Sequence, residues 1–211
     1  GVKSNLQCDP VEVKNGTASF SQSLTAGETY TIILWADYDD KNDQTVAPYT
    51  VTFANKIADA KMEVNYTGVK SNDETLDAFY AVKVIEVKGA QTETVELRRP
   101  FAQLNIGTND YAKAEAASGY VPTQSSVTVK GIYTTLNLAD GTVSGTADVT
   151  FGFADIDKTE AFPYDDKNYD YVAMNYVLVE GKSLVDVEFT LTDGTTSKTR
   201  TVWASTKRRI K

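Results

Sequence analysis

The stretch Val185-Asp-Val-Glu-Phe-Thr-Leu-Thr-Asp-Gly-Thr-Thr-Ser-Lys-Thr-Arg-Thr-Val-Trp203 indicates the fold class of this chain. From Val185 to Thr192, apolar and polar residues alternate, which predicts a β-strand with one buried face and one exposed face. Asp193-Gly194 follows and is a dipeptide typical of a tight hairpin turn. Thr195 to Trp203 is then predicted to return as a second strand. The stretch therefore predicts an antiparallel hairpin that is covered on one side only.

The same combination of strand-forming residues and turn residues recurs along most of the chain. Thr, Val and Tyr are abundant, and Tyr alone accounts for 12 of the 211 residues. These β-branched and aromatic residues favour a pleated, half-buried surface. The turn dipeptides are Asn15-Gly16, Ala26-Gly27, Asp140-Gly141 and Glu180-Gly181. Besides the hairpin, strands are predicted over residues 29–36, 49–53, 62–66, 79–87, 92–98, 101–106, 126–133, 143–151 and 171–179.

One segment has a helical pattern. Asn109 or Asp110 is placed to cap residues 111–117, and Gly119 is placed to end the helix about two turns later. Many short strands with at most one short helix indicate an all-β protein with a β-sandwich architecture, because a parallel sheet would need a helix between successive strands.

The length of 211 residues fits either one large sandwich or two small ones. Two are predicted: an N-terminal β-sandwich domain over residues 1–97 and a C-terminal β-sandwich domain over residues 98–211. The domain joint is predicted at Arg98, Arg99 and Pro100. Pro cannot donate a hydrogen bond to a central strand and has a fixed φ, so it marks a strand start or a break between sheets.

The composition excludes several classes of function. The chain has no His and one Cys, Cys8, so it has neither an imidazole base for a catalytic triad nor the ligands of the usual zinc sites. Its 21 Lys and Arg against 29 Asp and Glu give a net charge of −8, which argues against nucleic acid as a partner. No apolar leader opens the chain, and Gly1 in place of Met favours a signal segment outside this sequence over a cytosolic protein. No catalytic residue, cofactor or metal site is predicted.

Two acidic tracts resemble the start of a calcium loop, at residues 37–43 and 165–170. In the first, Lys41 replaces an oxygen ligand, Asn42 stands where the EF-hand needs Gly, and Pro48 replaces the bidentate Glu. Solvated acidic turns are therefore the favoured interpretation of both tracts, with calcium as the alternative.

Other patterns also favour a structural interpretation. Gly181-Lys182-Ser183 copies the end of a phosphate-binding loop, but Tyr176 stands where the first Gly is needed, so a hairpin turn is predicted. The basic segment 207–211 is predicted to be a solvated terminus. A pair of carboxylates for glycoside hydrolysis has no specific support in the pattern. The tyrosines have two interpretations: packing within and between strands, which is favoured, and stacking on sugar rings.

Several stretches together resemble the fimbrillins of Bacteroidales, the type V pilin subunits and related cell-adhesion proteins. They are Tyr30-Thr-Ile-Ile-Leu-Trp-Ala-Asp37, Asp77-Ala-Phe-Tyr80, Val95-Glu-Leu-Arg-Arg-Pro-Phe-Ala-Gln-Leu-Asn-Ile-Gly-Thr108 and Tyr171-Val-Ala-Met-Asn-Tyr-Val-Leu178. The resemblance implies two tandem transthyretin-like Greek-key β-sandwich domains, export as a lipoprotein precursor and display in fimbriae at the outer membrane. It also implies assembly in which removal of a leading strand opens a groove for a strand of the next subunit.

Two features depart from that family. The chain stops at Thr206-Lys-Arg-Arg-Ile-Lys211, where such proteins continue with a further apolar strand. Cys8 follows no apolar leader, so it is expected to be a buried or partly exposed structural thiol and not a lipidated one. The segment before Val11 is the candidate leading strand.

The expected function is that of a fimbrillin-like structural or adhesion subunit of bacterial surface fimbriae, not of an enzyme. Its expected partners are other fimbrial subunits, bound by strand addition, and glycans or proteins of host or bacterial surfaces. The alternative is a stand-alone carbohydrate-binding or calcium-stabilised surface module.

Overall fold

The computed structural model describes residues 8–9, 11–38, 48–53 and 56–207, and within them the chain is almost entirely β-structure. All pairings between its strands are antiparallel, which confirms the predicted all-β class. The described strands are β1 (Thr29–Asp37), β2 (Tyr49–Thr52), β3 (Lys61–Val64), β4 (Ala78–Glu86), β5 (Ala102–Thr108), β6 (Gln124–Asn137), β7 (Val143–Asp155), β8 (Ala161–Tyr164), β9 (Lys167–Val177), β10 (Lys182–Thr192) and β11 (Ser197–Lys207). The described helices are the 3-10 turns η1 (Ile57–Asp59) and η2 (Glu74–Leu76) and the α-helix α1 (Tyr111–Ser118).

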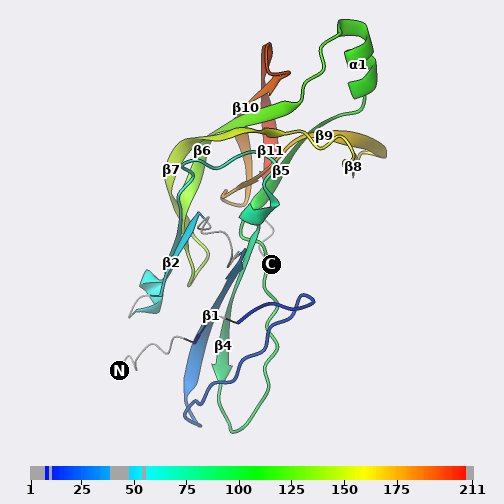
Figure 1. The fold of residues 1–211 in the computed structure, drawn as a ribbon. Helices are drawn as coiled ribbons and strands as arrows, with labels where there is room; N and C mark the ends of the chain where they lie inside the picture. Colours follow the sequence, from blue (N-terminus) through cyan, green and yellow to red (C-terminus); the bar gives the residue numbers. More distant parts are fainter. Residues whose placement is uncertain (1–7, 10, 39–47, 54–55, 208–211) are drawn as a thin grey trace.

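The main sheet is built around β6, which is 14 residues long. Its strand order is β11-β10-β6-β3-β2, and β7 pairs along the other edge of β6 (Figure 1). β10 pairs with the first half of β6, over residues 124–129, whereas β3 pairs with its last residues, over 135–137. β10 and β3 therefore pair with β6 one after the other along the same edge.

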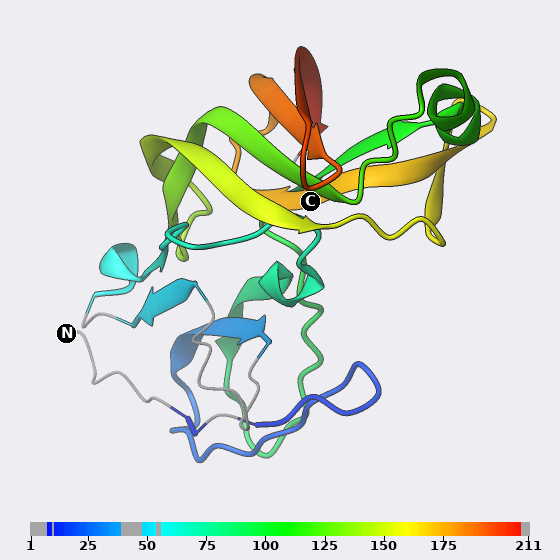
Figure 2. The ribbon, with the colours of Figure 1, turned by 45° about the horizontal axis from the view of Figure 1, so that its top comes forward.

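A second sheet, with the order β5-β9-β8, forms the other layer of the sandwich. The core between the layers contains Val127 and Ile132 of β6, Phe151 of β7 and Val177 of β9, each 0% exposed. Figure 2 shows these long strands together in one half of the molecule, with the ribbon formed by β1 and β4 in the other half.

The β1–β4 ribbon is a separate two-stranded sheet. Its end near Asp37 packs on the core through Ala78, which is 0% exposed, and through Trp35 and Tyr80, which are partly buried. The rest of the ribbon extends away from the sandwich, and none of the nine side chains of β1 is buried (Figure 1). Two-stranded sheets are marginal in water, so the ribbon depends on its packing against other parts of the protein.

The predicted helix is confirmed at residues 111–118. Gly119 ends it in the left-handed conformation, with φ of +65°, and donates its N–H to the carbonyl of Glu115. Glycine adopts this conformation without a steric penalty. Asp110 occupies the N-cap position, although its side chain makes no capping hydrogen bond. None of the helices in the described part of the chain is long and apolar enough to cross a membrane.

The strand predictions differ from the structure at two places. Residues 92–98 were predicted as a strand, and this is wrong: within them Arg98 alone forms a bridge, to Tyr80. The alternating pattern is present there, but the segment finds no neighbour to pair with along its length. β8 was not predicted. It contains Pro163 and lies at the edge of its sheet, where a residue without an N–H is tolerated.

Strands from the two sides of the predicted boundary between residues 97 and 98 pair with each other and share one buried cluster. β3 precedes the boundary and pairs with β6, which follows it. Met62 and Val64 of β3 belong to the same buried cluster as Leu136 and Leu138. The division into domains 1–97 and 98–211, and their transthyretin-like Greek-key topology, stay predictions.

Candidate functional sites

The predicted joint, from Arg98 to Pro100, is bonded to β4 and to Asp77, the residue before β4. Arg98 exchanges two backbone hydrogen bonds with Tyr80 of β4, both 2.9 Å long. Pro100 is buried. Arg99 forms a fork with Asp77, with Nε 2.6 Å from Oδ1 and Nη2 2.7 Å from Oδ2. Paired bonds of this kind are the strongest geometry that Arg and carboxylate groups make.

The Arg99 guanidinium also lies over two aromatic rings. Its Cζ is 5.6 Å from the ring centre of Phe79 and 5.3 Å from that of Tyr176 on β9. The hydroxyl of Tyr176 donates to Glu74 Oε2 at 2.6 Å. The hydrogen bond to Asp77 raises the pKa of Arg99, and burial followed by the bond to Glu74 raises the pKa of Tyr176. Both raised pKa values keep Arg99 charged and Tyr176 protonated near neutral pH, which suits a structural link.

The structure describes the second acidic tract in full but only the start of the first. Residues 39–47 lie outside the described part of the chain, so the first tract stays a prediction beyond Asp37 and Tyr38. In the second, Asp165 and Asp166 have φ of +48° and +59° and form the turn between β8 and β9. Tyr164 pairs with Lys167 across it, as in a two-residue hairpin. Among the described residues, no three His, Cys, Asp or Glu side chains are grouped to hold a metal ion.

Gly181 and Cys8 were also singled out from the sequence. Gly181 has φ of +57° and lies in the turn between β9 and β10, so the triplet lies in a turn and at the start of a strand. The prediction of a hairpin is wrong, because β9 and β10 belong to different sheets and do not pair. Cys8 is a free, exposed thiol with its Sγ 3.5 Å from Gln22 Oε1. The expectation of a buried or partly exposed structural thiol is therefore wrong, because Cys8 is exposed. The segment 208–211 of the basic tail lies outside the described residues.

The tyrosines mostly pack within the protein. Tyr66 contacts Phe151 in the core, with ring centres 5.9 Å apart. A second group follows the β8–β9 hairpin, and its rings contact one another at 4.7–6.3 Å between centres: Phe162, Tyr164, Tyr169 and Tyr171. Tyr164 is 69% exposed at the end of this group. The packing interpretation holds for these tyrosines.

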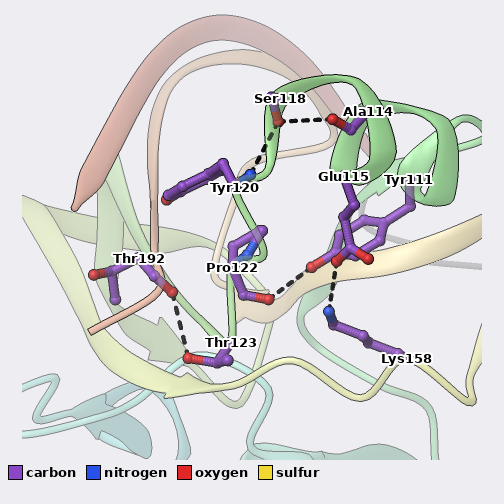
Figure 3. A network of polar contacts seen from close by, with 9 residues as sticks. All are labelled: Tyr111, Ala114, Glu115, Ser118, Tyr120, Pro122, Thr123, Lys158 and Thr192. Atoms are coloured by element: carbon purple, nitrogen blue, oxygen red, sulfur yellow. Dashed lines mark hydrogen bonds and ion pairs between the residues drawn. The ribbon is translucent and has the colours of Figure 1, made fainter. Parts of the chain in front are cut away.

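A network that the sequence did not reveal fixes α1 against the sandwich (Figure 3). Lys158 bonds Glu115 of α1 at 2.7 Å, and its Nζ lies 4.6 Å from the ring centre of Tyr111. The Tyr111 hydroxyl donates to the carbonyl of Pro122 at 2.8 Å. Tyr120 follows the helix and donates its hydroxyl to a backbone carbonyl of β10, at 2.7 Å. These bonds replace an apolar helix face, because no residue of α1 is buried.

The open edge of β1 is the clearest candidate for an interaction. Among the described strands β1 pairs with β4 alone, so no described strand lies beside its other edge. Residues 29–36 carry no charge, and the side chains from Ile32 to Trp35 are half-buried. On the face of the ribbon that Ile33 shares, Val82 is 36% and Val84 is 64% exposed. An apolar, uncharged strand edge of this kind is a template for another strand.

The predicted leading strand is not found where the structure describes the segment. Cys8 and Asp9 belong to no strand, and residues 1–7 and 10 lie outside the described part. Val11 and Val13 follow and are 46% and 52% exposed. Asn15 and Gly16 form a tight turn with φ of +51° and +73°, as predicted from this dipeptide.

Comparison with known proteins gives one distant structural neighbour and one family. The crystal structure at 3.00 Å resolution of a "putative adhesin" from Bacteroides ovatus ATCC 8483 is similar over 83% of this chain, with a TM-score of 0.43 and 7% sequence identity. The chain covers 64% of that protein's chain. None of the curated proteins matches. A family model described as "Family of unknown function (DUF6562)" matches residues 2–206, and the chain therefore belongs to this family.

Proposed function

We propose that this protein is a non-enzymatic adhesion or fimbrial subunit, displayed at the bacterial cell surface, that associates with other subunits by β-strand addition. The open edge of β1 is the observation that carries the proposal. The resemblance of Tyr30-Thr-Ile-Ile-Leu-Trp-Ala-Asp37 to the fimbrillins supports it, because this stretch is β1 itself.

Strand addition at β1 would remove the weakness of the ribbon. A sheet of two strands is marginal in water, and a third strand supplies a second row of backbone hydrogen bonds. It would also place side chains next to Thr31 and Ile33, on the face where Val82 and Val84 are exposed. Soluble proteins usually protect such edges with Lys, Pro or a bulge. β1 has none of these, and its one charged residue is Asp37 at the end that packs on the sandwich.

Association of purified copies tests the proposal. Thr31 is exposed, lies in the middle of the uncharged run and shares the face of Val84. Thr31→Lys places a charge on the uncharged edge strand, a change that disfavours strand pairing, so concentration-dependent oligomers of the wild type are expected to become monomers. Thr201→Lys is the matched control, because Thr201 is exposed on β11, an edge of the main sheet. Light scattering after size exclusion measures the mass of each species.

Two results would count against strand addition at β1. The first is a wild-type protein that stays monomeric at all concentrations, before and after limited proteolysis of the segment that precedes Val11. The second is equal loss of oligomers in both variants, since that would show a general effect of added charge.

A further inference from the structure

Trp203 is the most exposed large apolar side chain described in the structure, at 78%. It lies on β11 directly opposite Asp186 of β10. Leu184 is two residues away on β10, on the same face, and is 76% exposed. The intervening Val185 points to the other face and is buried. The outer face of the main sheet therefore carries a local apolar platform of two adjacent side chains.

A shallow cleft of about 470 Å³ adjoins this platform on the same sheet. The cleft spans β6, β7 and the start of β10, and its lining residues are Lys130, Gly131, Tyr133, Asp148, Leu184 and Asp186, with Val179 and Val185 below.

A bulge in the β6–β7 pairing forms the floor of the cleft. The register shifts between Val129 and Ile132, and Gly131 adopts φ of +65° within the bulge. The Gly131 N–H donates to Asp148 Oδ1 at 3.0 Å, which fixes that carboxylate at the rim. A Cβ added at Gly131 would meet no atom within 4 Å, so the space above the floor is open.

The polar groups of the rim match sugar hydroxyls. Asp148 and Asp186 supply carboxylate acceptors, Lys130 supplies an ammonium donor, and Tyr133 supplies a hydroxyl that lies 3.3 Å from Glu180 Oε2. A pyranose ring has hydroxyls around its edge, which donate and accept, and C–H groups on its faces, which pack on an indole ring. An exposed indole beside such groups is therefore suited to one ring face while the rim bonds the ring edge.

We propose that this face binds neutral oligosaccharides, with Trp203 as the stacking platform and Asp186, Asp148 and Lys130 as hydrogen-bonding groups. Neutral sugars are favoured over acidic ones because two carboxylates of the lining face one ammonium, and the whole chain carries a net charge of −8. This inference does not rest on strand addition, since it uses side chains on the face of β10 and β11 and not the edge of β1.

Binding of cellotetraose, chitotetraose and mannotetraose to the full chain tests the proposal, with 3′-sialyllactose as the acidic comparison. Calorimetry is expected to detect at least one neutral tetrasaccharide at a concentration of about 5 mM or less, and weaker binding of the acidic sugar. Trp203→Ala is expected to lower the affinity at least about tenfold, and Asp186→Ala is expected to lower it as well. Tyr164→Ala is the matched control, because Tyr164 is also a highly exposed aromatic residue but lies on β8.

The proposal is overturned if none of the three neutral sugars binds, if Trp203→Ala binds as well as the wild type, or if Tyr164→Ala loses binding equally. Circular dichroism of each variant checks that the fold is kept, and Asp186→Ala gives a second reading if Trp203→Ala is unstable. Thr31→Lys should bind the sugar as the wild type does, which separates a failure of this proposal from a failure of strand addition.

Discussion

A double-mutant cycle on Arg99 and Asp77 measures how strongly the joint is held. The variants are Arg99→Ala, Asp77→Ala and the two changes together. The pair is partly buried, with side-chain exposures of 37% for Arg99 and 19% for Asp77. We expect the two single changes to be non-additive, because each removes the same pair of hydrogen bonds.

The magnitude follows from the geometry and the exposure of the pair. Fully exposed ion pairs contribute about 0.2–1 kcal/mol, and breaking a fully buried pair costs about 3–5 kcal/mol. The Arg99–Asp77 fork lies between these limits, and solvent screens its more exposed partner. A coupling energy of about 1–2 kcal/mol is therefore expected. Arg99→Ala also loses the contacts with Phe79 and Tyr176, at about 0.5–1 kcal/mol each, so its total cost is expected to be about 2–4 kcal/mol.

Urea unfolding at neutral pH, followed by circular dichroism, gives the free energy of unfolding for each variant. Lys83 and Glu93 are the control pair, because their 2.8 Å ion pair is 35% exposed on both sides and makes no fork. Their coupling is expected to be clearly weaker than that of Arg99 and Asp77, because solvent screens exposed pairs. A coupling below about 0.3 kcal/mol for Arg99 and Asp77 would refute the reasoning, since separate sites add within that error.

Three further changes test the interior and the turns. Asn175 is 2% exposed with no partner for either amide atom in the described structure, so Asn175→Leu should raise the free energy of unfolding by about 1 kcal/mol in urea melts; a loss of stability would show that the amide is satisfied. A Cβ at Gly107 would lie 2.6 Å from Phe162, so Gly107→Ala should cost about 1–3 kcal/mol, whereas an unchanged melting temperature would show that the ring moves freely. Hydrogen bonds from threonines two or three residues on lower the pKa of Asp157 and Asp193. Their contribution to stability is thus present above the usual carboxyl pKa of about 4 and lost as the pH falls through the lowered pKa, so melting temperatures should drop less in acid for Asp157→Asn/Asp193→Asn than for the wild type.

Most strand positions could be predicted because they depend on local pattern. The alternation from Val185 to Thr192 reports directly which side chains face the core, and Val185 and Val187 are buried as expected. Residues 92–98 show the limit of this reasoning, since a strand also needs a neighbour. Despite their alternating pattern, these residues form a segment that bridges β4 at Arg98 alone.

The register of the last hairpin could not be predicted from its turn dipeptide. A two-residue turn at Asp193-Gly194 would place Trp203 opposite Leu184. In the structure the Asp193 side chain accepts hydrogen bonds from the N–H groups of Thr195 and Thr196, and Thr192 pairs with Ser197. This longer loop shifts the pairing by two residues and places Trp203 opposite Asp186.

The candidate sites depend on contacts between distant residues, which one sequence does not show. Arg99 could be singled out because it precedes Pro100, and Asp77 begins one of the stretches that resemble the fimbrillins. Nothing in the sequence indicated that the two residues, 22 positions apart, form a pair. The cleft beside Trp203 arises from a bulge at Gly131 in a different pair of strands. No pattern in the sequence connects the residues of the cleft. They come together because the strands that carry them pair in the folded protein.

The two proposed surfaces would strengthen each other in an assembly. The β1 edge belongs to the ribbon, whereas Trp203 and its cleft lie on the outer face of the main sheet. Strand addition at β1 uses backbone groups of the ribbon and leaves that face free. A shallow, open cleft binds a single sugar weakly, but repeated copies on one polymer raise the effective affinity by about 10²–10⁴ without any new contact. Weak sugar binding by the isolated chain would therefore be sufficient for a subunit that acts through multivalent attachment.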